Sequence, residues 1–216
     1  MRTRCLLIAG VSMTLLLGNA RPAQAHGVEA TGQESVAGFV GLGFTHMLTG
    51  GDHVLFIAGV VLLAWQPRRA ARLLSLFALG HSATLVTATL AGWRLNPGLV
   101  DIVIADSVAF VGGIGLFGRP RHYRWFGTAV LGFGLVHGLG LATRFQALKV
   151  PYGEVTSRLV AFNLGVELGQ VLCLYLLCLI GEALVRGPGR HRTERAVFGG
   201  LVALGVGLSF THVPLS

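Results

Sequence analysis

Long apolar blocks separated by short polar connectors make up most of this chain of 216 residues. Blocks of roughly 18 or more apolar residues are typical of helices that cross a lipid bilayer. We predict six spans, at about residues 36–65, 71–91, 98–117, 124–145, 159–186 and 196–213. The expected fold is an all-α polytopic membrane bundle, with a single transmembrane domain over residues 26–216.

The first apolar block, before these spans, has a different pattern. Two arginines precede an apolar run from Cys5 to Leu17, and Ala23-Gln24-Ala25 matches the A-x-A pattern at which signal peptidase cleaves. We therefore expect residues 1–25 to be a cleaved signal peptide. The alternative is that this block stays attached as a further span.

The distribution of basic residues predicts the orientation. The chain is 53% hydrophobic and 12% charged, about half the charged fraction of a soluble domain, and its formal charge is +8. The first, third and fifth connectors hold ten arginines, whereas the other connectors and span ends hold only Arg94, Arg144, Lys149 and Arg158. By the positive-inside rule the arginine-rich connectors are cytoplasmic and both mature termini lie outside. The basic charge thus requires no nucleic-acid partner.

Polar side chains nevertheless occur at similar depth in five of the six predicted spans. They are His46, Asp52, His53, His81, Ser82, Asp106, His137, Asn163, Glu167 and Gln170. Ionisable groups are costly in hydrocarbon, so those present usually face the bundle interior and have a function. Because these residues lie in the middle or outer part of the spans, we predict that they line one shared polar site.

Helical spacing refines this prediction in two places. Asn163, Glu167 and Gln170 are separated by four and three residues, which places them on one helix face. His46 and His53 would also share a face of a continuous helix. Gly50-Gly51 would instead break that helix and open it toward a cavity, as substrate sites of transporters do. The sequence leaves both geometries open.

Histidines combined with carboxylates predict a site for a divalent transition metal. Imidazole nitrogen suits nickel, cobalt, zinc and copper, and oxygen ligands keep binding reversible. The predicted metal ligands are His46, Asp52, His53, His81, His137 and Glu167, with Asp106, Asn163, Gln170 and Ser82 as possible supporting residues. We expect the metal to be a substrate and no cofactor to be tightly bound. The competing interpretation is that single histidines and amides only bridge helices by hydrogen bonds.

Four stretches, HMLTGGDHVLF, LGHSATL, FGLVHGLGLA and FNLGVELGQ, resemble in order the motifs of the HupE/UreJ family. The resemblance runs from about Phe39 to the end of the fifth span. It implies a six-span bacterial inner-membrane protein associated with nickel supply, and it implicates His46, Asp52 and His53 in nickel passage. A family motif resembling FHGxxHGxE is matched only in part around His137, and we infer that Glu167 replaces its glutamate.

The expected function is that of an inner-membrane permease for a divalent metal, nickel first and cobalt next, and not an enzyme. HExxH, HxxHH and GxSxG motifs do not occur in the sequence. The alternatives are a non-transporting metal-handling or scaffold subunit of a membrane complex and, with less support, an intramembrane metalloenzyme. Expected partners are the lipid bilayer, the metal ion and either further copies of the chain or other membrane subunits.

Overall fold

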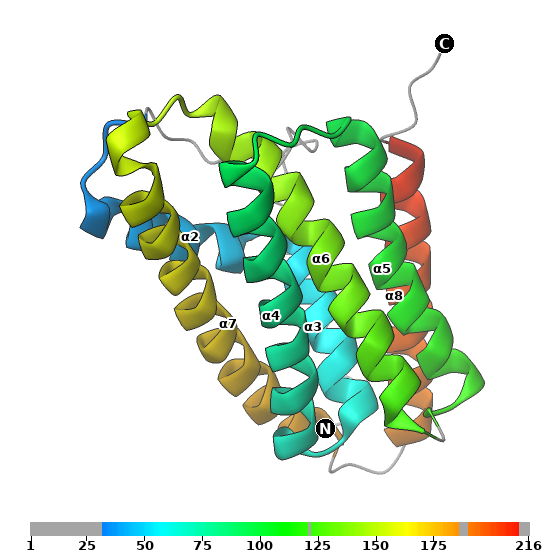
Figure 1. Cartoon of the computed structure of the whole chain (residues 1–216). Helices are drawn as coiled ribbons and strands as arrows, with labels where there is room; N and C mark the ends of the chain where they lie inside the picture. Colours follow the sequence, from blue (N-terminus) through cyan, green and yellow to red (C-terminus); the bar gives the residue numbers. More distant parts are fainter. Residues whose placement is uncertain (1–31, 121, 186–189, 212–216) are drawn as a thin grey trace.

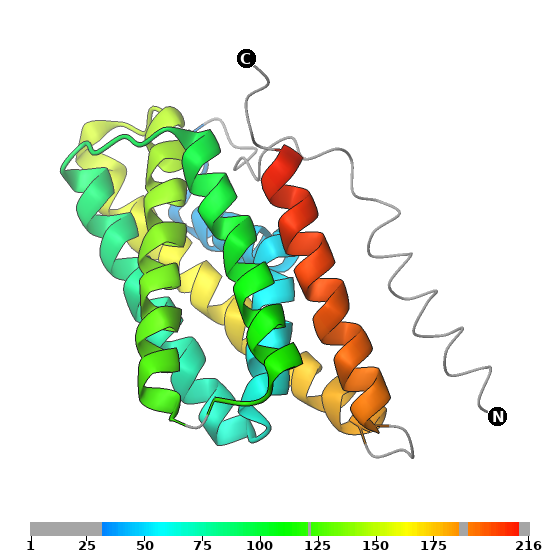
Figure 2. The same ribbon diagram turned by 90° about the vertical axis from the view of Figure 1, so that its right-hand side faces the viewer.

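The computed structural model describes residues 32–120, 122–185 and 190–211, and all regular structure in these ranges is helical (Figures 1 and 2). The predicted signal peptide lies outside them. The elements are α2 (Val36–Thr49), α3 (Gly51–Ala64), α4 (Pro67–Leu90), α5 (Pro97–Phe117), α6 (Tyr123–Ala147), the short 3-10 helix η1 (Tyr152–Glu154), α7 (Val155–Val185) and α8 (Arg190–Thr211).

The helical polytopic bundle is confirmed. Five helices are long and apolar enough to cross a membrane, and the bent pair α2–α3 makes a sixth crossing if it counts as one span. Several helices begin before the predicted spans, α4 at Pro67 and α8 at Arg190. Hydropathy marks the segment that lies in hydrocarbon, whereas backbone hydrogen bonding continues into the polar interface. A proline in the first helical turn, as in α4 and α5, favours such a start.

The first predicted span is broken, which decides between the two geometries left open above. α2 and α3 meet at an angle of 64°, with Gly50 as the residue between them. Its backbone is extended (φ −67°, ψ 97°), and its N–H closes α2 on the carbonyl of His46. A Cβ at Gly50 would lie 2.8 Å from Nδ1 of His53 and 3.0 Å from the His46 carbonyl, so the break leaves little room for a side chain. In Figure 1, α2 lies across the bundle while α3 runs along it.

Three helix pairs pack most closely: α4 with α6, α2 with α7, and α5 with α8. Glycines let the backbones touch at these crossings, as is common in membrane bundles. A Cβ at Gly43 of α2 would lie 1.9 Å from the Phe162 carbonyl oxygen of α7, and one at Gly165 would lie 2.0 Å from the Val40 carbonyl oxygen. Gly41, also on α2, has open space instead. The crossing therefore depends on particular glycines.

A buried arginine fixes the start of α2 against α7. The Arg158 guanidinium donates a hydrogen bond to the Gly32 carbonyl and forms an ion pair with Glu154, one turn earlier. The same group lies 5.5 Å from the centre of the Phe39 ring. α2 is thus held to α7 both at its beginning and at the glycine crossing.

We predict that Gly43→Ala lowers the stability of the purified protein, whereas Gly41→Ala does not. The added methyl group at position 43 meets backbone atoms of α7, and such overpacking typically costs about 1–3 kcal/mol. At position 41 the same substitution gains helix propensity and meets nothing. Thermal unfolding in detergent measures both variants. Equal melting temperatures would contradict the close α2–α7 contact.

Candidate functional site

Four histidines from four helices meet in the interior of the bundle. His46 comes from α2, His53 from α3, His81 from α4 and His137 from α6, and their exposed fractions are 9%, 4%, 1% and 2%. The ring centre of His53 lies 5.2 Å from that of His46, 6.1 Å from that of His81 and 5.0 Å from that of His137. We call these four residues the histidine cluster. Residues up to 91 positions apart in the sequence thus converge around His53.

The break at Gly50 allows the first two histidines to meet. His46 lies in the last turn of α2, and His53 lies in the first turn of α3. Asp52, beside it, has its Oδ1 atom 3.3 Å from Nδ1 of His53. A carboxylate in the first turn of a helix is favoured by the helix dipole, so α3 stabilises the charge of Asp52. The broken helix therefore brings two imidazoles and one carboxylate to the same place.

Hydrogen bonds orient two of the rings. Nδ1 of His137 lies 2.8 Å from the Phe133 carbonyl oxygen, and Nδ1 of His53 faces the Asp52 carboxylate. Because both partners are acceptors, we assign the proton to Nδ1 in each ring, which leaves the Nε2 lone pair available. Nε2 of His53, Nε2 of His137 and both ring nitrogens of His81 are buried and have no hydrogen-bond partner among the described residues. Buried polar atoms without partners are rare and destabilising, so they require an explanation.

The rings of the histidine cluster pack mainly edge to face. Within the described ranges, no group of three or more His, Cys, Asp or Glu side chains is arranged so that it could hold a metal ion. The interplanar angles of His53 with His46, His81 and His137 are 71°, 65° and 75°. The backbone thus brings the imidazoles together, and a shared ion would require the rings to rotate.

Three further predicted residues form a hydrogen-bonded chain beside the histidine cluster. Ser82 of α4 donates to Oδ1 of Asn163 on α7 over 3.0 Å, and Nδ2 of Asn163 donates to Glu167 over 3.2 Å. Ser82 follows His81, and Phe162, next to Asn163, has its ring centre 5.8 Å from that of His46. Glu167 is exposed at the outer surface of α7. This chain links α4 to α7 at the margin of the cluster.

The two remaining predicted residues bridge helices. Gln170 is buried, and its Nε2 atom donates to the Leu74 carbonyl of α4 over 3.1 Å. Asp106 is exposed on α5 and accepts a 2.6 Å hydrogen bond from Ser209 of α8. Asp106 thus bonds within the α5–α8 pair, whereas the four histidines lie on α2, α3, α4 and α6.

Three phenylalanines, whose spacing in the sequence is that of ordinary core residues, cover one side of the histidine cluster. The Phe77 ring centre lies 5.0 Å from that of His137, 6.0 Å from that of His81 and 6.3 Å from that of His53. Phe56 lies 5.1 Å from Phe77 and 6.0 Å from Phe133. Each lies three or four residues from a cluster histidine, toward the arginine-rich end of the bundle. We call Phe56, Phe77 and Phe133 the phenylalanine layer.

Comparison with protein families matches residues 23–213 to the family described as HupE / UreJ protein. The match includes every helix in the described residues, from α2 to α8. Comparison with curated proteins and comparison with solved structures each found no match. The matched family is known for metal transporters of the nickel and cobalt type and is associated with transport rather than catalysis. Because the match extends over most of the sequence, the chain belongs to the HupE/UreJ family.

Proposed function

We propose that this protein is a permease for a divalent transition metal, nickel first and cobalt next, and that the ion passes through the histidine cluster. The observation that carries the proposal is the set of buried imidazole nitrogens without hydrogen-bond partners on His53, His81 and His137. These residues come from three helices, and the His81 and His137 rings both adjoin that of His53. A cation bound to such lone pairs would replace the missing hydrogen bonds.

Binding in this scheme centres on His53. Asp52 holds the Nδ1 proton and directs the Nε2 lone pair of His53 away from itself, as carboxylates do behind metal-ligating histidines. The imidazoles rotate about their side-chain bonds to bring two or more nitrogens onto one ion. The break at Gly50 separates His46 from His53 and allows their two helices to adjust independently. No thiolate takes part, so the site retains an affinity from which an ion can leave.

The phenylalanine layer closes the inner side of the path. The Phe56 and Phe77 rings are fully buried directly against the histidine cluster. The distribution of arginines predicts that this side faces the cytoplasm of a bacterial cell. In uptake, the ion enters from outside, binds to the cluster and crosses the layer only after these rings move.

A second function, a non-transporting scaffold or metal-handling subunit, has two observations in its favour. Polar contacts such as Ser82 with Asn163 and Gln170 with the Leu74 carbonyl join helices, and no three metal-ligating side chains of the described residues are arranged to hold an ion. In that case, substitutions in the cluster would lower the amount of assembled protein and would leave the metal flux per molecule unchanged.

We predict that His53→Asn lowers the initial rate of nickel uptake at least about tenfold at matched membrane levels. Replacing a residue that hydrogen-bonds to a metal ligand typically lowers metal affinity or activity 10–100-fold. Loss of the central imidazole itself should lower the uptake rate at least as much. Uptake of radioactive nickel is measured in cells that lack their own nickel permeases. His191→Asn, an exposed residue near the start of α8, is the control. Equal uptake by both variants and the wild type would refute the role of His53.

A second prediction concerns the carboxylate behind His53. Asp52→Asn keeps an acceptor for Nδ1 but removes the charge, so the KM for nickel uptake rises about tenfold, within the range typical of such groups. Asp106→Asn makes the same chemical change on α5, where Ser209 can still donate to the amide oxygen. This control leaves KM within about twofold, because distant sites act independently. An equal rise in KM for both variants would show that the effect is not specific to the carboxylate beside His53.

A third prediction tests the phenylalanine layer as a barrier. Phe77→Leu shortens the side chain at the contact with His137 and Phe56, and we expect nickel uptake to become faster and less selective against zinc. Phe126→Leu makes the same change on α6 at another fully buried position nearer the arginine-rich end. Competition of zinc with radioactive nickel measures selectivity in both variants. Slower uptake by Phe77→Leu with unchanged selectivity would argue against a barrier at this layer.

A further inference from the structure

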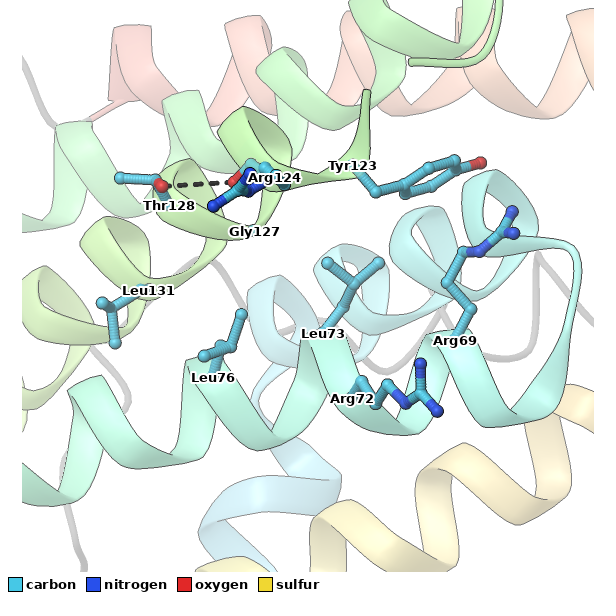
Figure 3. A pocket seen from close by; sticks show the side chains of 9 residues that line it. All are labelled: Arg69, Arg72, Leu73, Leu76, Tyr123, Arg124, Gly127, Thr128 and Leu131. Carbon is cyan, nitrogen blue, oxygen red and sulfur yellow. Dashed lines mark hydrogen bonds between the residues drawn. The ribbon is translucent and has the colours of Figure 1, made fainter. Parts of the chain in front are cut away.

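An open groove lies between the first turns of α4 and α6, at the arginine-rich end of the bundle. Its volume is about 490 Å³. Figure 3 shows Arg69 and Arg72 on the α4 side and Arg124 on the α6 side. Neither the proposed metal site nor the family assignment accounts for this groove, which shares no lining residue with the histidine cluster or the phenylalanine layer.

The polar part of the groove is strongly basic. It is lined by three guanidinium groups, and no Asp or Glu of the part of the chain that the structure describes lines it. Among the described residues, Arg72 and Arg124 form no ion pair, whereas Arg119, Arg144 and Arg158 each have a carboxylate partner. Such a concentration of positive charge is unfavourable by itself and favours an anion.

One of the three arginines is held in place by the groove wall. The Arg69 guanidinium lies 4.3 Å from the centre of the Tyr123 ring, and the Tyr123 hydroxyl donates to the Leu63 carbonyl over 2.8 Å. The cation–π contact holds Arg69 against Tyr123, the first residue of α6, without neutralising its charge. The wall thus fixes a donor before any anion arrives.

Apart from Thr128, the rest of the groove lining is apolar and lies along the two helices. Leu73 and Leu76 of α4 lie opposite Gly127 and Leu131 of α6 (Figure 3). A Cβ at Gly127 would lie 3.1 Å from the end of the Leu76 side chain, so glycine keeps this floor open. The apolar floor does not stabilise a small water-soluble anion. An alkyl chain bound along the floor covers these leucines and removes their surface from water or from loosely packed lipid.

We propose that this groove binds an anionic phospholipid, with its phosphate between Arg69, Arg72 and Arg124 and an acyl chain along Leu73, Leu76 and Leu131. Basic pockets between spans on the cytoplasmic side are a recurrent way of holding acidic headgroups. The lipid contacts α4 and α6 together, and these helices carry His81 and His137. Its binding therefore stabilises the helix pair that supplies half of the histidine cluster.

The test measures the melting temperature of the purified protein in detergent with added phosphatidylglycerol, phosphatidylcholine of the same chain length, or soluble glycerol phosphate. Phosphatidylglycerol raises the melting temperature of the wild type more than either of the other two. In Arg72→Gln/Arg124→Gln, about thirtyfold more phosphatidylglycerol is needed for the same shift, since each of the two arginines near an anionic headgroup contributes on the order of 1 kcal/mol and about 1.4 kcal/mol is tenfold. Lipid-free melting temperatures confirm that each variant is folded.

Two further variants separate the groove from general surface charge. Arg192→Gln/Arg195→Gln removes the same charge at the start of α8, at the same end of the bundle, and keeps the wild-type response. Gly127→Val keeps every arginine but fills the groove floor, and its response to phosphatidylglycerol weakens. Three results would overturn the proposal: equal shifts with phosphatidylcholine, an equal shift with glycerol phosphate, or wild-type responses from both groove variants.

Discussion

The break between α2 and α3 is the constraint on which the interior of this protein depends. A continuous helix would carry His46 two turns away from His53, whereas the 64° bend folds the end of α2 over the start of α3. The two rings then lie 5.2 Å apart, and Asp52 comes to the positive end of a new helix. Gly50 permits this turn because a side chain there would meet His53 and the His46 carbonyl. Irregular backbone at membrane depth is tolerated where other protein surrounds it, and α7 and α4 provide that cover.

Close helix pairing supplies the other half of the cluster. Glycine crossings bring α4 against α6, so that the rings of His81 and His137 both lie next to that of His53. The result is a compact group of imidazoles with the phenylalanine layer beneath it. A buried imidazole nitrogen with no partner is expensive, and three such residues in contact make sense if an ion satisfies them during passage.

Much of this arrangement could be predicted from the sequence, because depth in a membrane is readable from hydropathy and charge. The polytopic helical bundle and the grouping of His46, His53, His81 and His137 follow from it. The depth of a residue in the membrane does not determine which side of its helix it lies on. Asp106 therefore lies at the predicted depth but bonds to Ser209 within the α5–α8 pair and not to the histidine cluster. The sequence also could not decide the break at Gly50, since glycine is equally common in straight membrane helices. The phenylalanine layer was not identified because buried phenylalanines at helical spacing have the same pattern as ordinary core residues.

The central claim is that imidazoles of the histidine cluster bind the transported metal. X-ray absorption at the nickel edge, on purified protein loaded with one equivalent of nickel, tests it most directly. The account predicts bound nickel with at least two imidazole nitrogens in its first shell, and loss of that imidazole signal in His53→Asn but not in His191→Asn. Nickel that fails to bind, or that binds with oxygen ligands alone and the same spectrum in His53→Asn, would contradict the account.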